Sequence, residues 1–313
     1  MNFQQLRIIR ETVRQNFNLT EVGNSLATSQ SGVSKHILDL EDELGIELFV
    51  RKGKRLLGLT EPGKELLAIV ERILLDTKNI KQLGEQYSQT DKGQLTIATT
   101  HTQARYALPK VVGQFKQRFP KVHLALHQGS PQEIVEMLLD GRADIGIATE
   151  ALDQQSELVT FPYYSWQHTA VAPKGHPLEG QANISLEDIA EYPIVTYHEG
   201  FTGRKSIDAT FAKIGITPDI VMSALDADVI KTYVELGLGI GVIASMAYQI
   251  DRDSKLTLLD TATLFEKNTT QIALRKGYFL RGFAYEFIEL CSPDLSEAKI
   301  KAALKPLSSI DID

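Results

Sequence analysis

The chain has 313 residues, of which 43% are hydrophobic and 23% charged, as in a globular protein large enough for two domains. Its formal net charge of -7 argues at first against a nucleic-acid partner. A single cysteine, Cys291, excludes an intrachain disulfide and any cluster of cysteine metal ligands.

Apolar residues at helical spacing predict three helices in the first 45 residues. One helix is predicted over 3–17, and a second around Val22 and Leu26. A third carries an i, i+4, i+7, i+11 stripe, made of Val33, Ile37, Leu40 and Leu44. The hydroxyls of Thr28 and Ser29 can cap this third helix. We therefore expect two short helices packed on a common core, covered by the first.

The side chains on the opposite face of the third helix are short, neutral or cationic, and rich in hydrogen-bonding groups. Such a face suits the DNA major groove, where base edges offer donors and acceptors. An ordinary helical hairpin with a solvated polar face is the alternative interpretation. The predicted base-reading residues are Ser29, Gln30, Ser31, Ser34 and Lys35.

Two short apolar runs, 46–50 and 56–59, flank a glycine-centred basic turn and predict a hairpin, the wing of a winged helix. Residues 1–60 carry eight Lys and Arg against seven Asp and Glu, a balance of +1, so the acidity lies downstream. We expect modest DNA affinity per monomer and a need for dimers. The wing cations predicted to lie beside DNA phosphates are Arg51, Lys52, Lys54 and Arg55.

Thr60 and Pro62 open a long helix predicted over 61–88, with the threonine as its cap. At about 1.5 Å per residue it is a rod of roughly 40 Å. Its heptad-like seam predicts pairing with a second copy of the chain, although a helix lying along its own domain is the alternative. The seam consists of Leu66, Val70, Ile73, Thr77, Ile80, Gly84 and Tyr87.

Beyond a polar linker at 89–93, strands and helices alternate, which predicts parallel sheets covered by helices. A first series has strands 95–99, 122–127 and 144–148 with helices 109–119 and 131–140. A second has strands 169–172, 194–197, 220–222 and 241–244 with helices 204–213 and 227–236. Strand 270–274 is expected to return to the first sheet, before a helix at 279–289. Two α/β lobes joined by a double crossover resemble periplasmic binding proteins, whose ligand lies between the lobes.

The order of parts resembles a LysR-type transcriptional regulator. The motifs are 29–34 (SQSGVS), 40–45 (LEDELG), 48–51 (LFVR) and 60–63 (TEPG), whereas 21–23 (EVG) departs from the paired alanines usual in the family. The resemblance implies three parts: a winged helix-turn-helix over 1–60, a linker helix over 61–91, and an effector domain over 92–313. Lobe I is expected at about 92–163 and 269–305, and lobe II at about 164–268.

A narrower resemblance, to the CysB/Cbl subfamily, rests on 96–106 (TIATTHTQARY), 144–150 (DIGIATE), 200–204 (GFTGR) and 226–232 (DADVIKT). It implies regulation, mainly activation, of sulfur-assimilation and cysteine-biosynthesis genes. It also implies that N-acetylserine or O-acetylserine induces the regulator and that sulfate or thiosulfate opposes this induction. Residues 226–228, Met246 and Ala247 favour the CysB form over Cbl.

The segment 99–103 falls where a strand ends and a helix begins, so free backbone amides there can bind an anion. For any single threonine at such a place, capping is the alternative role. We expect Arg105 and Arg204 to form structural pairs, and Trp166 to wall the site at the crossover. The resemblance implies that the sulfate or inducer site is lined by Thr100, Thr102, Gln103, Thr149 and Thr202.

Nothing in the sequence assembles a Ser/His/Asp or metal-ligand set, so an enzyme, a cofactor and a metal are not expected. The predicted partners are promoter DNA, a second copy in a dimer or tetramer, a small anionic effector and RNA polymerase. No signal-like or spanning segment is present, so we expect a cytoplasmic protein without a membrane partner. The alternatives are a Cbl-like regulator of sulfonate use, a LysR protein sensing another small acid, and a solute-binding module without a DNA role.

Overall fold

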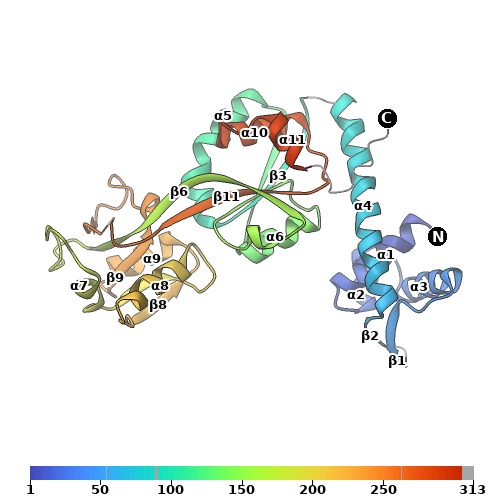
Figure 1. The fold of residues 1–313 in the computed structure, drawn as a ribbon, viewed down its shortest axis with the longest axis horizontal. Helices are drawn as coiled ribbons and strands as arrows, with labels where there is room; N and C mark the ends of the chain where they lie inside the picture. The colour runs from blue at the N-terminus through green and yellow to red at the C-terminus, as the bar shows by residue number, and fades with distance from the viewer. Residues whose placement is uncertain (54, 89–90, 262, 305–313) are drawn as a thin grey trace. The chain divides into compact units, whose positions relative to one another are not determined.

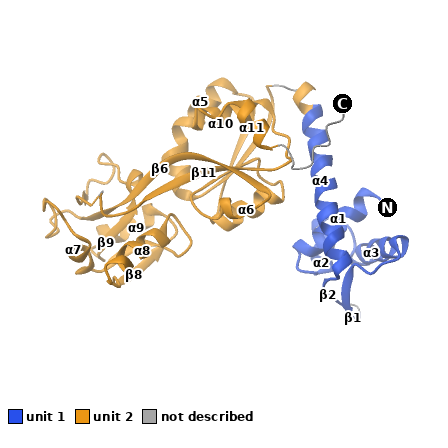
Figure 2. Ribbon diagram, viewed as in Figure 1, with its two compact units in different colours: residues 1–84 blue, residues 85–313 orange. Residues whose placement is uncertain are grey.

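The computed structural model describes residues 1–53, 55–88, 91–261 and 263–304. The chain forms two compact units, residues 1–84 and 85–313 (Figure 2). The predicted wing cation Lys54 and positions 89 and 90 of the predicted linker lie outside the described residues. In the described part of the chain, no helix is both long and apolar enough to cross a membrane.

The first unit contains the three predicted helices, followed by a hairpin and most of the long helix. Helix α1 spans Phe3–Arg14, α2 Leu19–Ser25 and α3 Gln30–Leu44. Strands β1 (Phe49–Lys52) and β2 (Arg55–Leu59) pair antiparallel, as a wing requires. The first helix ends earlier than predicted, because Asn16 and Phe17 have φ of 48° and 64°, which no α-helix accommodates.

The core of this unit confirms the helical stripe except at its last position. Val33, Ile37 and Leu40 are fully buried, as predicted. Leu44 is 39% exposed, so its assignment to the core was wrong. It is the last residue of α3, and Gly45 follows with a left-handed φ of 68°, which ends the helix before Leu44 can pack.

Two glycines permit close backbone approaches that hold the first unit together. A Cβ on Gly63, in the first turn of α4 (Glu61–Ser88), would lie 2.1 Å from the carbonyl oxygen of Leu48. A Cβ on Gly23 would lie 2.8 Å from the carbonyl oxygen of Thr28. The family departure at 21–23 therefore keeps the small residue that the turn between α2 and α3 demands.

Helix α4 has the predicted bounds, and Thr60 caps it by accepting a hydrogen bond from the Gly63 amide at 3.0 Å. Its two halves differ in burial. Val70 is fully buried, whereas Ile80 is 70% and Tyr87 84% exposed. The C-terminal half of the predicted seam therefore remains available for a partner, and self-association stays a prediction.

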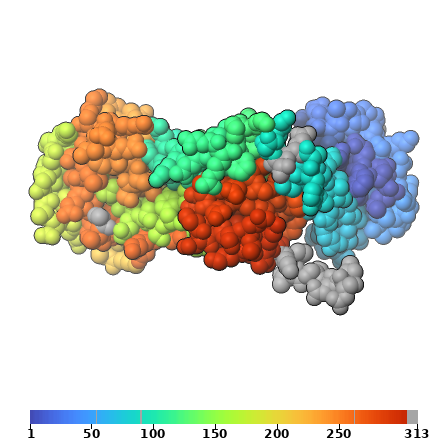
Figure 3. All heavy atoms as spheres, turned by 90° about the horizontal axis from the view of Figure 1, so that it is seen from above, coloured from blue at the N-terminus to red at the C-terminus, as the bar shows by residue number. Residues whose placement is uncertain are grey.

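In lobe I of the second unit, parallel strands lie in the order β4-β3-β5: Val122–Gln128, Gly93–Thr99 and Ile145–Ala148. Helix α6 (Pro131–Leu139) covers one face of this sheet, and α5 (Leu108–Arg118) and α10 (Gly282–Cys291) lie together on the other (Figure 1). The rings of Phe115 and Phe287 meet edge to face at 5.4 Å. The surfaces of these two helices, green and red, adjoin in Figure 3.

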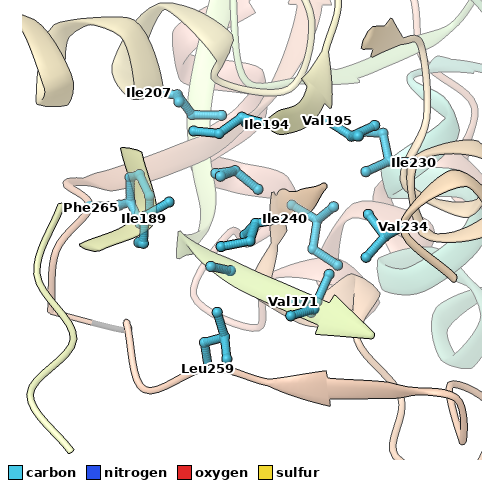
Figure 4. Packing of buried hydrophobic residues seen from close by; sticks show 14 of the residues in the cluster. Val171, Ile189, Ile194, Val195, Ile207, Ile230, Val234, Ile240, Leu259 and Phe265 are labelled. Carbon is cyan, nitrogen blue, oxygen red and sulfur yellow. The ribbon is translucent and has the colours of Figure 1, made fainter. Parts of the chain in front are cut away.

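Lobe II repeats the plan with β7 (Ile194–Tyr197), β8 (Ile220–Ala224) and β9 (Ile240–Ala244). Helices α7 (Leu186–Ala190), α8 (Arg204–Lys213) and α9 (Ala227–Glu235) surround them. Residues such as Ile194, Ile230, Val234 and Ile240 interdigitate in a fully buried core (Figure 4). Such close packing makes the lobe a rigid unit.

Two long antiparallel strands, β6 (Leu158–Pro173) and β11 (Lys267–Arg275), run through both lobes (Figure 1). Strand β6 pairs with β11 over most of its length, then with β9 and with β10 (Leu256–Leu258). The sequence predicts only the end of β6, because Pro162 interrupts the pattern. That proline lies beside a bulge in the pairing, where a strand tolerates it. Helices α7 and α11 (Glu297–Leu304) were also missed.

Candidate functional site

The predicted base-reading face of α3 points away from the core of the first unit. Gln30, Ser31 and Lys35 are exposed and Ser34 is half-buried. Ser29 has a structural role, because its hydroxyl accepts a hydrogen bond from the Gly32 amide at 3.0 Å and so caps α3. Four of the five predicted residues are therefore accessible at the surface, so base recognition by them stays a prediction, and the fifth fixes the start of their helix.

The wing cations fall into two groups. Arg51 forms an ion pair with Glu41 of α3, whose carboxylate also accepts hydrogen bonds from the amides of Leu48 at 2.8 Å and Phe49 at 3.3 Å. Arg51 therefore fastens the wing to the reading helix. Lys52 and Arg55 are exposed and form no ion pair with any described residue.

A hollow of about 450 Å³ joins the reading helix to the root of the wing. It is bordered by Gln30 of α3, Arg55 of β2 and the residues that open α2. A phosphate group beside it would face both a cation and a helix N-terminus. A predicted base-reading residue, Gln30, and a predicted phosphate-binding residue, Arg55, therefore line one concave surface.

In the second unit, the predicted effector residues converge from both lobes on one buried cluster. The hydroxyls of Thr102 in lobe I and Thr202 in lobe II lie 3.4 Å apart. Both threonines are almost fully buried. Thr202 has a φ of 43°, an outlier for a β-branched residue. Such strain persists where the surroundings hold it, and it concentrates at ligand clamps and switch regions.

Three of the other predicted effector residues, Gln103, Thr149 and Trp166, meet at a hydroxyl that the sequence analysis missed, that of Thr270 on β11. It accepts hydrogen bonds from Gln103 Nε2 at 3.2 Å and Trp166 Nε1 at 3.0 Å, and lies 3.3 Å from the Thr149 hydroxyl. Tyr164 donates from its phenol to Gln103 Oε1. The Thr270 hydroxyl thus meets three side chains from the π-helical turn Gln103–Ala107, from β6 and from the loop after β5. The only available signal was its place on the strand expected to return to the first sheet.

Thr100 and the residues after it confirm the predicted transition from strand to helix. Thr100 is buried directly after β3, and its carbonyl oxygen accepts a hydrogen bond from the Ala104 amide at 3.0 Å. The helix then opens into a π-helical turn, Gln103–Ala107, before α5. Insertions of this kind are frequent at functional sites because they redirect side chains.

That π-helical turn sends two side chains across to lobe II. Tyr106 donates a hydrogen bond to Asp228 at 2.6 Å, and Arg105 Nε donates to the same carboxylate at 3.2 Å. Burial raises the pKa of Asp228, but the bonds from Tyr106 and Lys231 outweigh it and lower the pKa below its usual value. Arg204 pairs with Asp208. Both arginines therefore form structural pairs, as predicted.

Glu150, directly after Thr149, reaches across to lobe II, where its Oε1 accepts a hydrogen bond from the Gly203 amide. Burial raises the pKa of this carboxyl to about 7, and the Gly203 bond offsets part of that rise. His168 contacts the same loop, with Nε2 2.8 Å from the Thr202 carbonyl oxygen. Burial lowers the pKa of His168 to about 4, so the ring is neutral near pH 7.

Among the described residues, one group of side chains has ligand atoms close enough to surround a cation: His101, Asp226 and Asp228, all within 4.8 Å of one another. Its carboxylates are already engaged. Asp226 caps α9 by accepting from the Val229 amide at 2.9 Å, and Asp228 neutralises Arg105 and Lys231. The positive charges of Arg105 and Lys231 beside Asp228 would repel a metal ion. The arrangement instead favours a contact that joins the two lobes.

Two protein-family models match the chain. The model of the bacterial regulatory helix-turn-helix protein, lysR family, matches residues 3–64, and that of the LysR substrate binding domain matches residues 88–296. The chain belongs to the LysR family of transcriptional regulators. As a LysR regulator it is a DNA-binding protein and not an enzyme.

Similarity to curated LysR regulators extends over nearly the whole chain. It is 62% identical to SsuR of Burkholderia cenocepacia over 97% of this chain and 99% of the relative. It is 52% identical to CysB of the same organism, over 97% of both chains. It is also 53% identical to Cbl of Escherichia coli, over 100% of this chain and 99% of the relative. The predicted CysB/Cbl subfamily is confirmed.

Two solved structures are similar to this chain. The cofactor-binding domain of the Cbl regulator superposes with a TM-score of 0.66 and 48% identity, over 69% of this LysR chain and 95% of that one. Full-length CbnR in complex with its target DNA matches with a TM-score of 0.60 over 94% of this chain and 99% of that one. The latter, at 18% identity, supports the fold alone.

Proposed function

We propose that this LysR regulator controls genes of sulfur assimilation and cysteine biosynthesis, mainly as an activator. The observation that carries the proposal is identity of 52% or more, over nearly the full chain, to regulators named SsuR, CysB and Cbl. The proposal includes binding to promoter DNA as a dimer or tetramer and contact with RNA polymerase. Because the target is the chromosome, it also includes a cytoplasmic location.

The proposed effectors are small acids that bind between the lobes, with N-acetylserine or O-acetylserine inducing and sulfate or thiosulfate opposing. Supporting this, the hydroxyls of Thr102 and Thr202 meet across the lobes, and Gln103 and Trp166 donate into the same cluster. Neutral donors of this kind can bind an oxyanion without a cation. Beyond these ligands, the proposal includes no cofactor.

The proposed mechanism is a change of lobe closure on ligand binding. An effector that separates Thr102 from Thr202 would alter the contacts between lobes, and with them the geometry of subunits and the spacing of wing-helix pairs on DNA. Such coupling requires different ligand affinity in the two arrangements. Helix α3 and the wing of each subunit would still contact DNA, but the distance between the contacts of neighbouring subunits would change.

A second candidate is a Cbl-like regulator of sulfonate use. The specific observation that favours it is the higher identity to SsuR, 62%, than to CysB of the same organism, 52%. The features at 226–228, Met246 and Ala247 favour CysB, so the two candidates are separated by experiment.

The test is selection of genomic DNA fragments by purified full-length protein, alone, with N-acetylserine, and with sulfate. Fragments upstream of sulfate-transport and cysteine-synthesis genes, with enrichment that changes on adding N-acetylserine, would support the CysB-like function. Fragments upstream of sulfonate genes, with no acetylserine response, would replace it with the second candidate. Absence of both sets would refute the proposed regulon.

A further inference from the structure

Glu150 is a carboxylate that the proposed binding set does not include. Its Oε1 accepts a hydrogen bond from the Gly203 amide in the other lobe. Its Oε2 is buried and has no hydrogen-bond partner among the residues that the structure describes. A buried carboxylate oxygen without a donor is costly, by about 1–3 kcal/mol or more, so its retention calls for a physical reason.

No described cation neutralises this carboxylate. Arg204, next to Gly203, donates from Nε to Asp208 at 2.7 Å and from Nη1 to the Tyr197 carbonyl oxygen at 2.7 Å. His168 would touch a Cβ on Gly203 at 2.7 Å, but its buried ring is neutral near pH 7 because burial lowers its pKa. When the Glu150 side chain is ionised, no described cation therefore balances its negative charge.

Glu150 also lies where the two halves of the proposed effector site meet. It follows Thr149 on the lobe I side, and its hydrogen-bond donor follows Thr202 on the lobe II side. A Cβ on Gly203 would lie 2.8 Å from Asn268 Oδ1, so the loop lies close against β11 at this residue. A ligand held by the threonines from both lobes would lie beside the carboxylate.

We propose that Glu150 determines specificity at the interlobe site by favouring ligands that bring a hydrogen-bond donor over fully deprotonated oxyanions. An ionised carboxylate only accepts hydrogen bonds. It therefore pairs with an amide N–H, an ammonium group or a protonated acid oxygen, and it repels an anion that has no proton to offer. The inference rests on the proposed function only for the position of the effector site.

The matched probes are inorganic phosphate and sulfate, which are both tetrahedral and doubly charged at about pH 8 but differ by one proton. Titration calorimetry on the full-length protein gives the ratio of their affinities. We expect hydrogen phosphate to bind at least about tenfold more tightly than sulfate. A site built to accept a hydrogen bond from its ligand rejects an analogue that has no proton to donate. Glu150→Gln, which can donate from its amide nitrogen, should lower this ratio at least about tenfold by gaining affinity for sulfate.

Glu157→Gln, a neutralisation at an exposed position of the same lobe, is the matched control and should leave the ratio unchanged. Thermal denaturation of both variants checks that they are folded. An equal phosphate-to-sulfate ratio in wild type and Glu150→Gln would overturn the role of Glu150. Thr102→Ala separates the two proposals: if anion binding survives in that variant, the effector site itself is misplaced. If wild type binds neither anion, the proposed selectivity of Glu150 is wrong, whereas the proposed function is still decided by the DNA selection with N-acetylserine.

Discussion

The phenol of Tyr106 donates a hydrogen bond of 2.6 Å to Asp228, a residue 122 positions away on the opposite lobe. The contact continues through Lys231, whose ammonium group lies 3.4 Å from Asp228 and 2.9 Å from the buried carboxylate of Asp253. A phenol in lobe I is thereby tied to a charged network inside lobe II. Polar contacts therefore join the two lobes at this point.

Tyr106→Phe should weaken this closure. Removing a hydrogen bond to a charged carboxylate costs about 1.5–3 kcal/mol. We expect the urea midpoint of the second unit to fall, monitored through the fluorescence of Trp166, the only tryptophan in the chain. Tyr192→Phe, in lobe II, makes the same chemical change away from the lobe contact and should have little effect. Equal losses in both variants would argue against a clamp at Asp228.

Two buried titratable groups at the lobe contact should oppose each other in the pH dependence of stability. The pKa of Glu150 is raised from 4.5 to about 7. Its stabilising contribution to the free energy of unfolding is therefore fully present below pH 4.5 and is lost as pH rises through 7. The pKa of His168 is lowered from 6.5 to about 4, so its contribution is present above 6.5 and is lost as pH falls through 4. Between 4.5 and 6.5 the two slopes nearly cancel.

Glu150→Gln should remove the pH dependence that comes from Glu150 and leave the one that comes from His168. The free energy of unfolding of the second unit should then rise with pH across this window by up to about 1.4 kcal/mol per pH unit relative to wild type. His168→Gln should show the opposite trend. Urea denaturation at several pH values measures both. Parallel profiles for wild type and Glu150→Gln would show that the carboxyl does not titrate in this range.

The winged helix and the long helix could be predicted from sequence because their signals are local. Caps such as Ser29 and Thr60 and the stripe from Val33 to Leu40 act within a few residues. The predicted effector residues also lie in one region, since Thr102 meets Thr202 and Gln103 meets Thr270. Their grouping came from family resemblance, because no local pattern joins residues about a hundred positions apart.

Thr270 and Glu150 escaped prediction for a physical reason. Their roles depend on how β6 and β11 cross between lobes and on how the lobes meet, which are long-range pairings. Pro162 and the adjacent bulge conceal the first half of β6, so Trp166 could be placed only at a crossover of unknown register. Glu150 reads in the sequence as an ordinary polar residue at a strand end, and only the Gly203 contact reveals its burial.

Lys52 and Arg55 should contribute to DNA affinity through phosphates and not through base recognition. Replacing both with alanine should reduce the slope of log affinity against log salt by roughly 2, because each phosphate contact contributes about 0.9. Sequence preference among promoter fragments should be retained. Lys64→Ala, an exposed lysine on α4, is the control for loss of charge. A slope that stays unchanged would remove these cations from the DNA interface.

The exposed seam of α4 should mediate self-association. Ile80 of the seam is 70% exposed, and Leu83, which lies beside the seam on the same helix, is 44% exposed. A charge at such positions is costly to bury in a helix pair. Ile80→Glu with Leu83→Glu should shift the protein toward monomer in analytical ultracentrifugation. Lys81→Glu, one residue away on the exposed surface, should not. An unchanged assembly in the double variant would move the interface elsewhere.

The most direct test of the account is the effector response of Thr102→Ala combined with Thr202→Ala. Binding of the full-length protein to a selected promoter fragment is measured with and without N-acetylserine. The account predicts that the variant still binds the fragment but no longer changes its affinity or footprint when N-acetylserine is added. An effector response equal to that of wild type would contradict the claim that the contact between these two threonines marks the regulatory site.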